Sequence, residues 1–158
     1  MKIPTKEECL ALLNKNKTPS NVIKHSITVC KVAESITEEL IRKRIKLNKK
    51  LIIAAALLHD IERAKENHVI KGAKLLKSMG FKKVSEVIKK HSLYNLEQKN
   101  KQLTTWEEKI VFYADKRVMG NKIVSLKKRF EALEKNYNAD LSKELEFTKN
   151  IEKELLGK

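Results

Sequence analysis

The sequence is poor in residues that interrupt helices and in residues that build covalent or membrane-spanning frameworks. Its 158 residues include four Gly, two Pro and two Cys, and the longest unbroken apolar run has eight residues. With 41% hydrophobic and 35% charged residues, this composition is typical of a soluble helical protein and excludes disorder. A run of eight apolar residues is far too short to cross a membrane.

Two cysteines cannot define a disulfide framework. Cys9 and Cys30 both stand among apolar residues with helical spacing, so we expect two reduced core residues. No secretory signal opens the sequence, because residues 1–4 lead directly into charged residues. These features predict a cytoplasmic protein with no membrane partner, and the length predicts a single domain over residues 1–158.

The net charge of +15 raises the question of a nucleic-acid partner. Lysine greatly outnumbers arginine, the lysines run along the whole chain, and aromatic side chains for base stacking make up only 5%. A lysine-rich surface composition therefore explains the charge better than a nucleic-acid site does. A basic groove for a small phosphorylated molecule is compatible with the same charge. The sequence has no Gly-rich phosphate loop, internal repeat or low-complexity segment.

Hydrophobic spacing predicts an all-α fold, a single-domain bundle of about seven or eight helices. Capping boxes begin at Thr5 and at Thr105, each followed three residues later by Glu. The expected helices cover residues 5–15, 20–44, 47–58, 68–79 and 83–90, then one from 105 onward, and two between 125 and 156 that divide near 136–140. Residues 61–67 and 94–104 are expected to be loops, and no strand-like alternation persists anywhere.

The central helix is apolar from Leu51 to Leu58 and has a good N-cap residue, Asn48, just before it. A helix that is apolar all round is buried among other helices. It ends in His59 and Asp60. An isolated His-Asp pair is most simply one that turns to solvent as the helix ends. At the end of a buried helix, however, such ionisable groups need hydrogen-bond partners or a metal.

All four histidines of the sequence occupy comparable positions. His25 lies on the apolar stripe of its helix, His68 begins a helix face and His91 ends one. A single such histidine is usually a satisfied core residue. Four of them, joined by Asp60 and by Asp115 on an apolar stripe, indicate a metal site between helices. Imidazole and carboxylate ligands without thiolate favour Fe, Mn, Zn, Co or Ni. The number of candidate ligands suits one or two divalent ions, and a carboxylate would bridge a pair of ions. The candidate ligands are His25, His59, Asp60, His68, His91 and Asp115.

The order of these residues resembles the HD superfamily of metal-dependent phosphohydrolases. His25, then His59-Asp60, then Asp115 follow the family's minimal motif, and the resemblance covers about residues 20–119. It implies that these four residues hold one metal ion. Residues 125–156 then add C-terminal helices to this core.

Two further elements resemble the two-metal, HDIG-like members of the superfamily. His68 with Gly72 and Ala73 has the form His-x-x-x-Gly-Ala, and His91 matches a further ligand of those members. The resemblance implies that His68 and His91 help to hold a second metal ion, with Asp60 bridging the two.

Many relatives have His-Asp-Ile-Gly-Lys where this sequence has His59-Asp60-Ile61-Glu62-Arg63. Arg63 keeps a cation that can bind phosphate oxygens through two N–H groups. Glu62 replaces the Gly, which counts against substrates that need close backbone approach there. The Gly-Tyr-Pro signature of relatives that cleave cyclic dinucleotides is lacking. Among two-metal relatives, the hydrolases that split diadenosine tetraphosphate symmetrically are the closest functional analogue.

The implied activity is that of a metal-dependent phosphohydrolase, which cleaves a phosphate ester or anhydride of a nucleotide-like small molecule with a metal-activated water. Asp60 and Arg63 are the expected catalytic residues, and Arg63, Lys116 and Arg117 are candidates to bind the substrate phosphate. For Lys116 and Arg117 a solvated basic face is an equally good interpretation. Two other functions stay open: a catalytically silent HD-like domain that binds a phosphorylated ligand or regulates a partner, and a basic nucleic-acid-binding helical protein.

Overall fold

The computed structural model describes residues 2–93 and 102–157, and the fold is 67% helical. The all-α prediction is confirmed, with eight helices in the described residues. The predicted loop at 94–104 falls largely on residues 94–101, which lie outside the described residues. The elements are α1 (Lys6–Lys15), α2 (Ser20–Arg42), α3 (Lys49–Leu58), α4 (His68–Ser78), α5 (Lys82–Ile88), α6 (Trp106–Lys116), β1 (Val118–Met119), β2 (Lys122–Ile123), α7 (Leu126–Tyr137) and α8 (Ser142–Leu156).

Local sequence signals set the starts of several helices. The Thr5 and Thr105 hydroxyls accept the backbone N–H groups of Glu8 and Glu108, each at 3.1 Å. Both glutamate carboxylates in turn accept the backbone N–H of the capping threonine, so both predicted capping boxes are present. The Asn48 side chain accepts a backbone N–H in the first turn of α3 at 3.0 Å, as its position before the apolar run predicts.

A small antiparallel hairpin, β1–β2, departs from the prediction of a chain without strands. Val118 pairs with Ile123 and Met119 with Lys122, and Gly120 in the turn has a φ of 61°. Two residues per strand are too few to create a period-two hydrophobic pattern, so the sequence carried no signal for it. Glycine adopts a positive φ without steric cost, which suits it to this turn.

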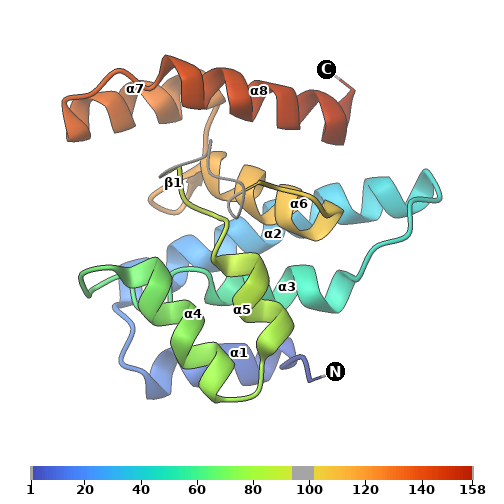
Figure 1. Cartoon of the computed structure of the whole chain (residues 1–158), viewed down its shortest axis with the longest axis vertical. Helices are drawn as coiled ribbons and strands as arrows, with labels where there is room; N and C mark the ends of the chain where they lie inside the picture. Colours follow the sequence, from blue (N-terminus) through green and yellow to red (C-terminus); the bar gives the residue numbers. More distant parts are fainter. Residues whose placement is uncertain (1, 94–101, 158) are drawn as a thin grey trace.

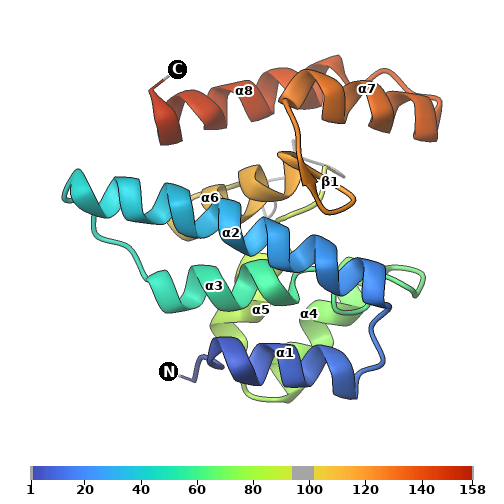
Figure 2. The same ribbon diagram turned by 180° about the vertical axis from the view of Figure 1, so that it is seen from behind.

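The helices stack in layers around α3. α3 packs against α1, α2, α5 and α6. Figures 1 and 2 show α2 and α6 on one side of α3, and α1, α4 and α5 on the other. The uninterrupted apolar sequence of α3 follows from this position, because a helix enclosed by neighbours has no polar face.

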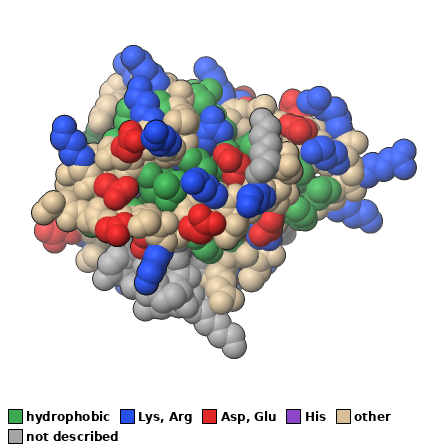
Figure 3. All heavy atoms as spheres, turned by 90° about the horizontal axis from the view of Figure 1, so that it is seen from above, with side chains coloured by type: hydrophobic (Ala, Val, Ile, Leu, Met, Phe, Trp, Pro, Cys, Tyr) green, Lys and Arg blue, Asp and Glu red, His purple; other side chains and the backbone are tan. Residues whose placement is uncertain are grey.

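The last two helices form an outer layer. α8 packs on α6 and α2, and α7 packs on α8. Figure 3 looks onto this layer and shows Lys and Arg interspersed with Asp and Glu over its surface. Eight basic and seven acidic residues follow Val124 in the sequence, so almost all of the net charge of +15 lies before that point.

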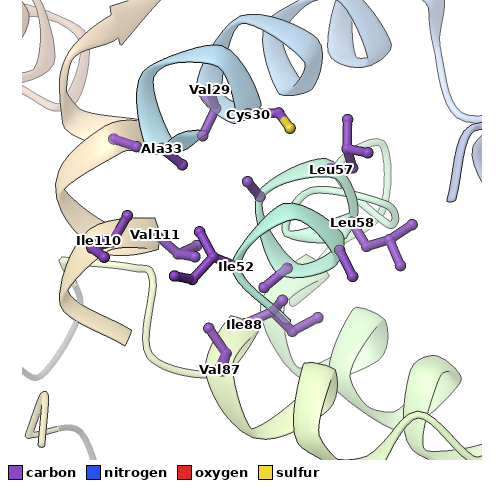
Figure 4. Close-up of a cluster of buried hydrophobic side chains, with 14 of the residues drawn as sticks. Val29, Cys30, Ala33, Ile52, Leu57, Leu58, Val87, Ile88, Ile110 and Val111 are labelled. Atoms are coloured by element: carbon purple, nitrogen blue, oxygen red, sulfur yellow. The ribbon is translucent and has the colours of Figure 1, made fainter. Parts of the chain in front are cut away.

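The core forms where α3 meets its neighbours (Figure 4). Ile52, Leu57 and Leu58 are at most 1% exposed, and burial of each such side chain stabilises the fold by about 1.5–3 kcal/mol. Cys9 and Cys30 are also free and buried, as predicted, and burial raises the pKa of both thiols to about 12. Among the described residues, no helix is both long and apolar enough to cross a membrane.

Candidate metal centre

Two of the four histidines are oriented by the carbonyl groups at a helix end. His59 is the C-cap residue of α3, and its Nδ1 donates to the Ala56 carbonyl at 2.7 Å. His91 follows α5, and its Nδ1 donates to the Ile88 carbonyl at 2.7 Å. The last carbonyls of a helix have no partner within the helix, so each can accept an imidazole N–H three residues further on. A carbonyl can only accept, and in both rings Nε2 is therefore the nitrogen that faces the site.

His25 is oriented by a distant part of the chain. Its Nδ1 donates to the Gly120 carbonyl, in the turn of the β1–β2 hairpin, at 2.7 Å. Its Nε2 then lies 3.0 Å from Asp115 Oδ1. The hairpin that sequence reasoning missed thus supplies the group that orients one candidate ligand.

The first group of candidate ligands contains His25, His59, Asp60 and Asp115. His59 Nε2 lies 3.3 Å from Asp115 Oδ1 and 3.3 Å from Asp60 Oδ2, and His25 Nε2 lies 3.9 Å from Asp60 Oδ2. Ligand atoms about 2.1 Å from a shared ion lie about 3.0–3.4 Å apart in octahedral or tetrahedral geometry. The three shorter separations in this group, 3.0, 3.3 and 3.3 Å, fall in that range.

The second group contains Asp60, His68 and His91. Asp60 Oδ1 lies 3.4 Å from His91 Nε2 and 3.6 Å from His68 Nε2. Within each group the candidate ligand atoms are all within 4.8 Å of one another. Asp60 belongs to both groups, with Oδ2 facing the first and Oδ1 facing the second.

Two buried atoms at the centre have no hydrogen-bond partner in the described part of the chain: His59 Nε2 and Asp60 Oδ1. An unsatisfied buried polar atom costs about 1–3 kcal/mol, and native structures rarely tolerate one without a function. His59 Nε2 is a nitrogen of the first group and Asp60 Oδ1 is an oxygen that faces the second, so each group has one buried candidate ligand atom without a hydrogen bond. The residues present therefore fit a divalent transition metal ion at either group.

The charges around His59 also favour a cation at this position. Burial alone lowers the pKa of His59, but the adjacent Asp60 and Asp115 carboxylates outweigh burial and raise the pKa to about 10. Burial raises the pKa of Asp115, but Lys116, His25 and His59 outweigh it and hold that pKa well below its usual value. A proton on His59 and a metal ion on its Nε2 satisfy the same demand for positive charge.

The turn after Asp60 is held closely against its neighbours. The Ile61 carbonyl accepts hydrogen bonds from Asn16 Nδ2 and Thr18 Oγ1, both at 3.0 Å. A Cβ atom at Gly72 would lie 3.4 Å from the Ile61 side chain, so glycine allows α4 to pack closely on this turn. Glu62 is buried with Lys65 Nζ 2.6 Å from its Oε2. Its φ is not positive, so the local backbone does not need the glycine found in relatives.

The three cations expected to bind substrate phosphate lie in different surroundings. Arg63 is exposed, and its Nη1 donates to His68 Nε2 at 3.1 Å. Lys116 is 3% exposed and its ammonium contacts Asp115 Oδ2, not solvent. Arg117 donates through Nε to the Val124 carbonyl at 2.7 Å and through Nη1 to a tyrosine hydroxyl at 2.8 Å. The fold therefore uses two of the three ammonium N–H groups of Lys116 and two of the five guanidinium N–H groups of Arg117.

Comparison with known proteins places these observations in a family. The family model described as HD domain matches residues 22–120. A tRNA (cytidine(56)-2'-O)-methyltransferase of Picrophilus torridus is 31% identical over 146 residues, which are 84% of this chain and 41% of that protein. An uncharacterised protein of Methanocaldococcus jannaschii is 30% identical over 142 residues, 79% of this chain and 83% of that protein. No solved structure gives a significant match. The chain spans less than half of the methyltransferase, and it belongs to the HD-domain family.

Proposed function

We propose that this protein is a metal-dependent phosphohydrolase that cleaves a phosphate ester or anhydride of a nucleotide-like small molecule. The observation that carries the proposal is the position of Asp60, whose two carboxylate oxygens face two separate groups of candidate ligand atoms. A carboxylate shared in this way is the arrangement of a two-metal hydrolytic site. Family membership supports the same class of chemistry.

In this proposal His25, His59, Asp60 and Asp115 hold one divalent ion, and Asp60, His68 and His91 hold the second. Bound ions supply Lewis acidity and lower the pKa of a water molecule to near neutrality. The described residues supply the rest. The Nδ1 hydrogen bonds of His25, His59 and His91 fix the orientation of three rings, and burial of Asp60 and Asp115 excludes bulk water from the carboxylates.

Arg63 is the proposed contact to the substrate phosphate. Arginine has no acceptor, so His68 Nε2 accepts the present hydrogen bond from Arg63 through its lone pair. Burial lowers the pKa of His68, which keeps that lone pair available. If the lone pair is used to bind a metal ion, the exposed guanidinium is released and can donate two N–H groups to phosphate oxygens.

The test combines metal analysis with a substrate panel. The purified protein should contain up to two Fe, Mn, Zn, Co or Ni ions per chain, by elemental analysis. After reconstitution with each metal it should hydrolyse members of a panel of nucleotides, dinucleoside polyphosphates including diadenosine tetraphosphate, and generic phosphomonoesters and phosphodiesters. A protein that binds two ions and hydrolyses nothing in the panel would favour the alternative of a silent HD-like domain that binds a phosphorylated ligand.

We also propose that residues 1–158 act as one domain. The buried apolar cluster includes Cys9 and Leu13 of α1 and also Ile151 and Leu155 of α8, so it extends across the chain. The two free cysteines are compatible with a reducing compartment such as the cytoplasm.

A second candidate function is binding of transfer RNA. It is favoured by the name of the Picrophilus torridus relative, a tRNA methyltransferase, and by the positive charge that lies before Ser125. Neutralisation of several phosphates by lysines would make binding fall steeply with salt. Filter binding of unmodified tRNA between 50 and about 200 mM salt tests this, with heparin as a competitor. Binding that is equally tight to any polyanion would reflect charge alone and would reject the tRNA function.

A further inference from the structure

Lys116 is a buried cation that contacts both groups of the candidate metal centre. Its Nζ donates to Asp115 Oδ2 at 2.7 Å and to the His91 backbone carbonyl at 2.8 Å. It also lies 4.7 Å from the centre of the Phe112 ring. Asp115 belongs to the first group of ligands and His91 to the second, so a single ammonium joins the two.

The surroundings of this ammonium favour a role within the fold over contact with substrate. The residue is 3% exposed, and a buried charge is tolerated only when hydrogen bonds and an opposite charge compensate for the lost water. Two oxygen acceptors and the face of an aromatic ring provide that compensation here. An ammonium that turned to a substrate would have to give up both short hydrogen bonds.

The contact also determines how Asp115 can bind a metal ion. Its Oδ1 lies 3.0 Å from His25 Nε2 and 3.3 Å from His59 Nε2, while its Oδ2 is occupied by Lys116. Only Oδ1 is then available to an ion in the first group. At the same time the hydrogen bond to the His91 carbonyl ties the chain segment after α5 to the end of α6.

We propose that Lys116 is a positioning residue, which makes Asp115 a one-oxygen ligand and holds His91 at a fixed distance from it so that two metal ions can bind together. This role rests on the proposed two-metal centre. It replaces the sequence-based expectation that Lys116 binds the substrate phosphate. Groups that orient metal ligands in this way typically change metal affinity or activity by about 10–100-fold when they are removed.

The test is Lys116→Met, which keeps a long apolar stem without the ammonium. The matched control is Lys90→Met. Lys90 precedes His91, and its Nζ lies 3.0 Å from Glu108 Oε1, so it links the segment after α5 to α6 through a residue that is not a candidate ligand. Both variants and the wild-type chain are stripped of metal and titrated with Co²⁺. Bound Co²⁺ is counted by elemental analysis, the visible absorption bands report its coordination, and circular dichroism reports folding.

Lys116→Met should bind Co²⁺ about 10–100-fold more weakly than the wild type and show altered visible bands, since Asp115 Oδ2 becomes free to coordinate. Lys90→Met should match the wild type in both measurements. Wild-type affinity and bands in Lys116→Met would overturn the proposal, and so would an equal loss in Lys90→Met. If Lys116→Met does not fold, Lys116→Leu, which also has no donor, is measured instead, with the same expectation and the same overturning result.

These readouts separate the positioning role from the proposed activity. A wild-type chain that binds no Co²⁺ would overturn the metal centre and the role of Lys116 together. A wild-type chain that binds two Co²⁺ ions but hydrolyses no phosphate would remove only the proposed activity, and the weaker binding of Lys116→Met would still support the positioning role.

Discussion

Asp60→Asn should abolish binding of both metal ions, because each oxygen of Asp60 faces a different group of ligands. Oδ2 lies 3.3 Å from His59 Nε2, and Oδ1 lies 3.4 Å from His91 Nε2. The amide keeps the shape of the side chain but has no negative charge and only one acceptor oxygen. It cannot bridge two cations, so we expect loss of both ions and of hydrolysis, with the helical circular dichroism signal retained.

The size of the effect follows from the linkage between binding and folding. A ligand present at 100 times its Kd stabilises the native state by about 2.7 kcal/mol. For a chain of this size, about 1 kcal/mol shifts the melting temperature by about 2–4 °C. Each Co²⁺ or Mn²⁺ ion bound at 100 times its Kd should therefore raise the melting temperature of the wild type by about 5–11 °C. In Asp60→Asn the rise should be absent.

The assay is thermal unfolding followed by circular dichroism, with and without metal, together with elemental analysis after dialysis. Asp140→Asn is the matched control, because Asp140 is an exposed aspartate between α7 and α8 and bonds only to Ser142 among the described residues. It should keep the full metal-dependent rise. Two ions per chain and a wild-type rise in Asp60→Asn would refute the bridging role, and with it the two-metal centre.

Three further predictions concern the same centre. His68→Ala combined with His91→Ala should reduce the metal content from two ions to one, and an unchanged content would exclude the second site. Arg63→Ala should keep both ions but lower kcat/KM, with a loss of transition-state stabilisation of about 1–3 kcal/mol, the scale of a lost hydrogen bond to a charged group. Loss of metal in this variant would contradict its proposed role. In metal-free protein the raised pKa of His59, about 10 against an ordinary 6.5, stabilises the fold below about pH 6.5, and this contribution is lost as the pH rises through 10. Metal uptake at pH 7 must displace the proton on His59, so metal affinity should rise with pH. Calorimetry in buffers of different ionisation enthalpy should show the proton release, and metal uptake without proton release would contradict this prediction.

Much of the fold could be predicted because its signals are local. The capping threonines Thr5 and Thr105 determine where two helices begin, and the unbroken apolar run of α3 requires burial on every side. The orientation of His59 is local as well. It uses the carbonyl of Ala56, three residues earlier, which a helix end leaves without a partner.

The sequence also indicated which side chains belong to the candidate centre. Which atom of each side chain faces which group of ligands could be seen only in the tertiary structure. The two oxygens of Asp60 are equivalent in sequence. Only the packing of α5 against α3, and of α4 against α5, brings His91 and His68 to Oδ1 while Oδ2 faces His59. The surroundings of Lys116 show the same limit. Lys116 follows Asp115 on a helix, and nothing in the local pattern tells whether its ammonium faces solvent or the His91 carbonyl.

The sequence by itself determined the helical class, the family and the identity of the six candidate ligands, because hydrophobic period, caps and the order of His and Asp residues are properties of neighbouring positions. The tertiary structure alone decided what orients His25 and where the charge of Lys116 lies. The Gly120 carbonyl reaches His25 across 95 positions, and Lys116 reaches the His91 carbonyl across 25. Such contacts depend on how the helices pack. The hydrophobic effect drives that packing but is not directional, so a local sequence pattern does not specify which distant groups meet.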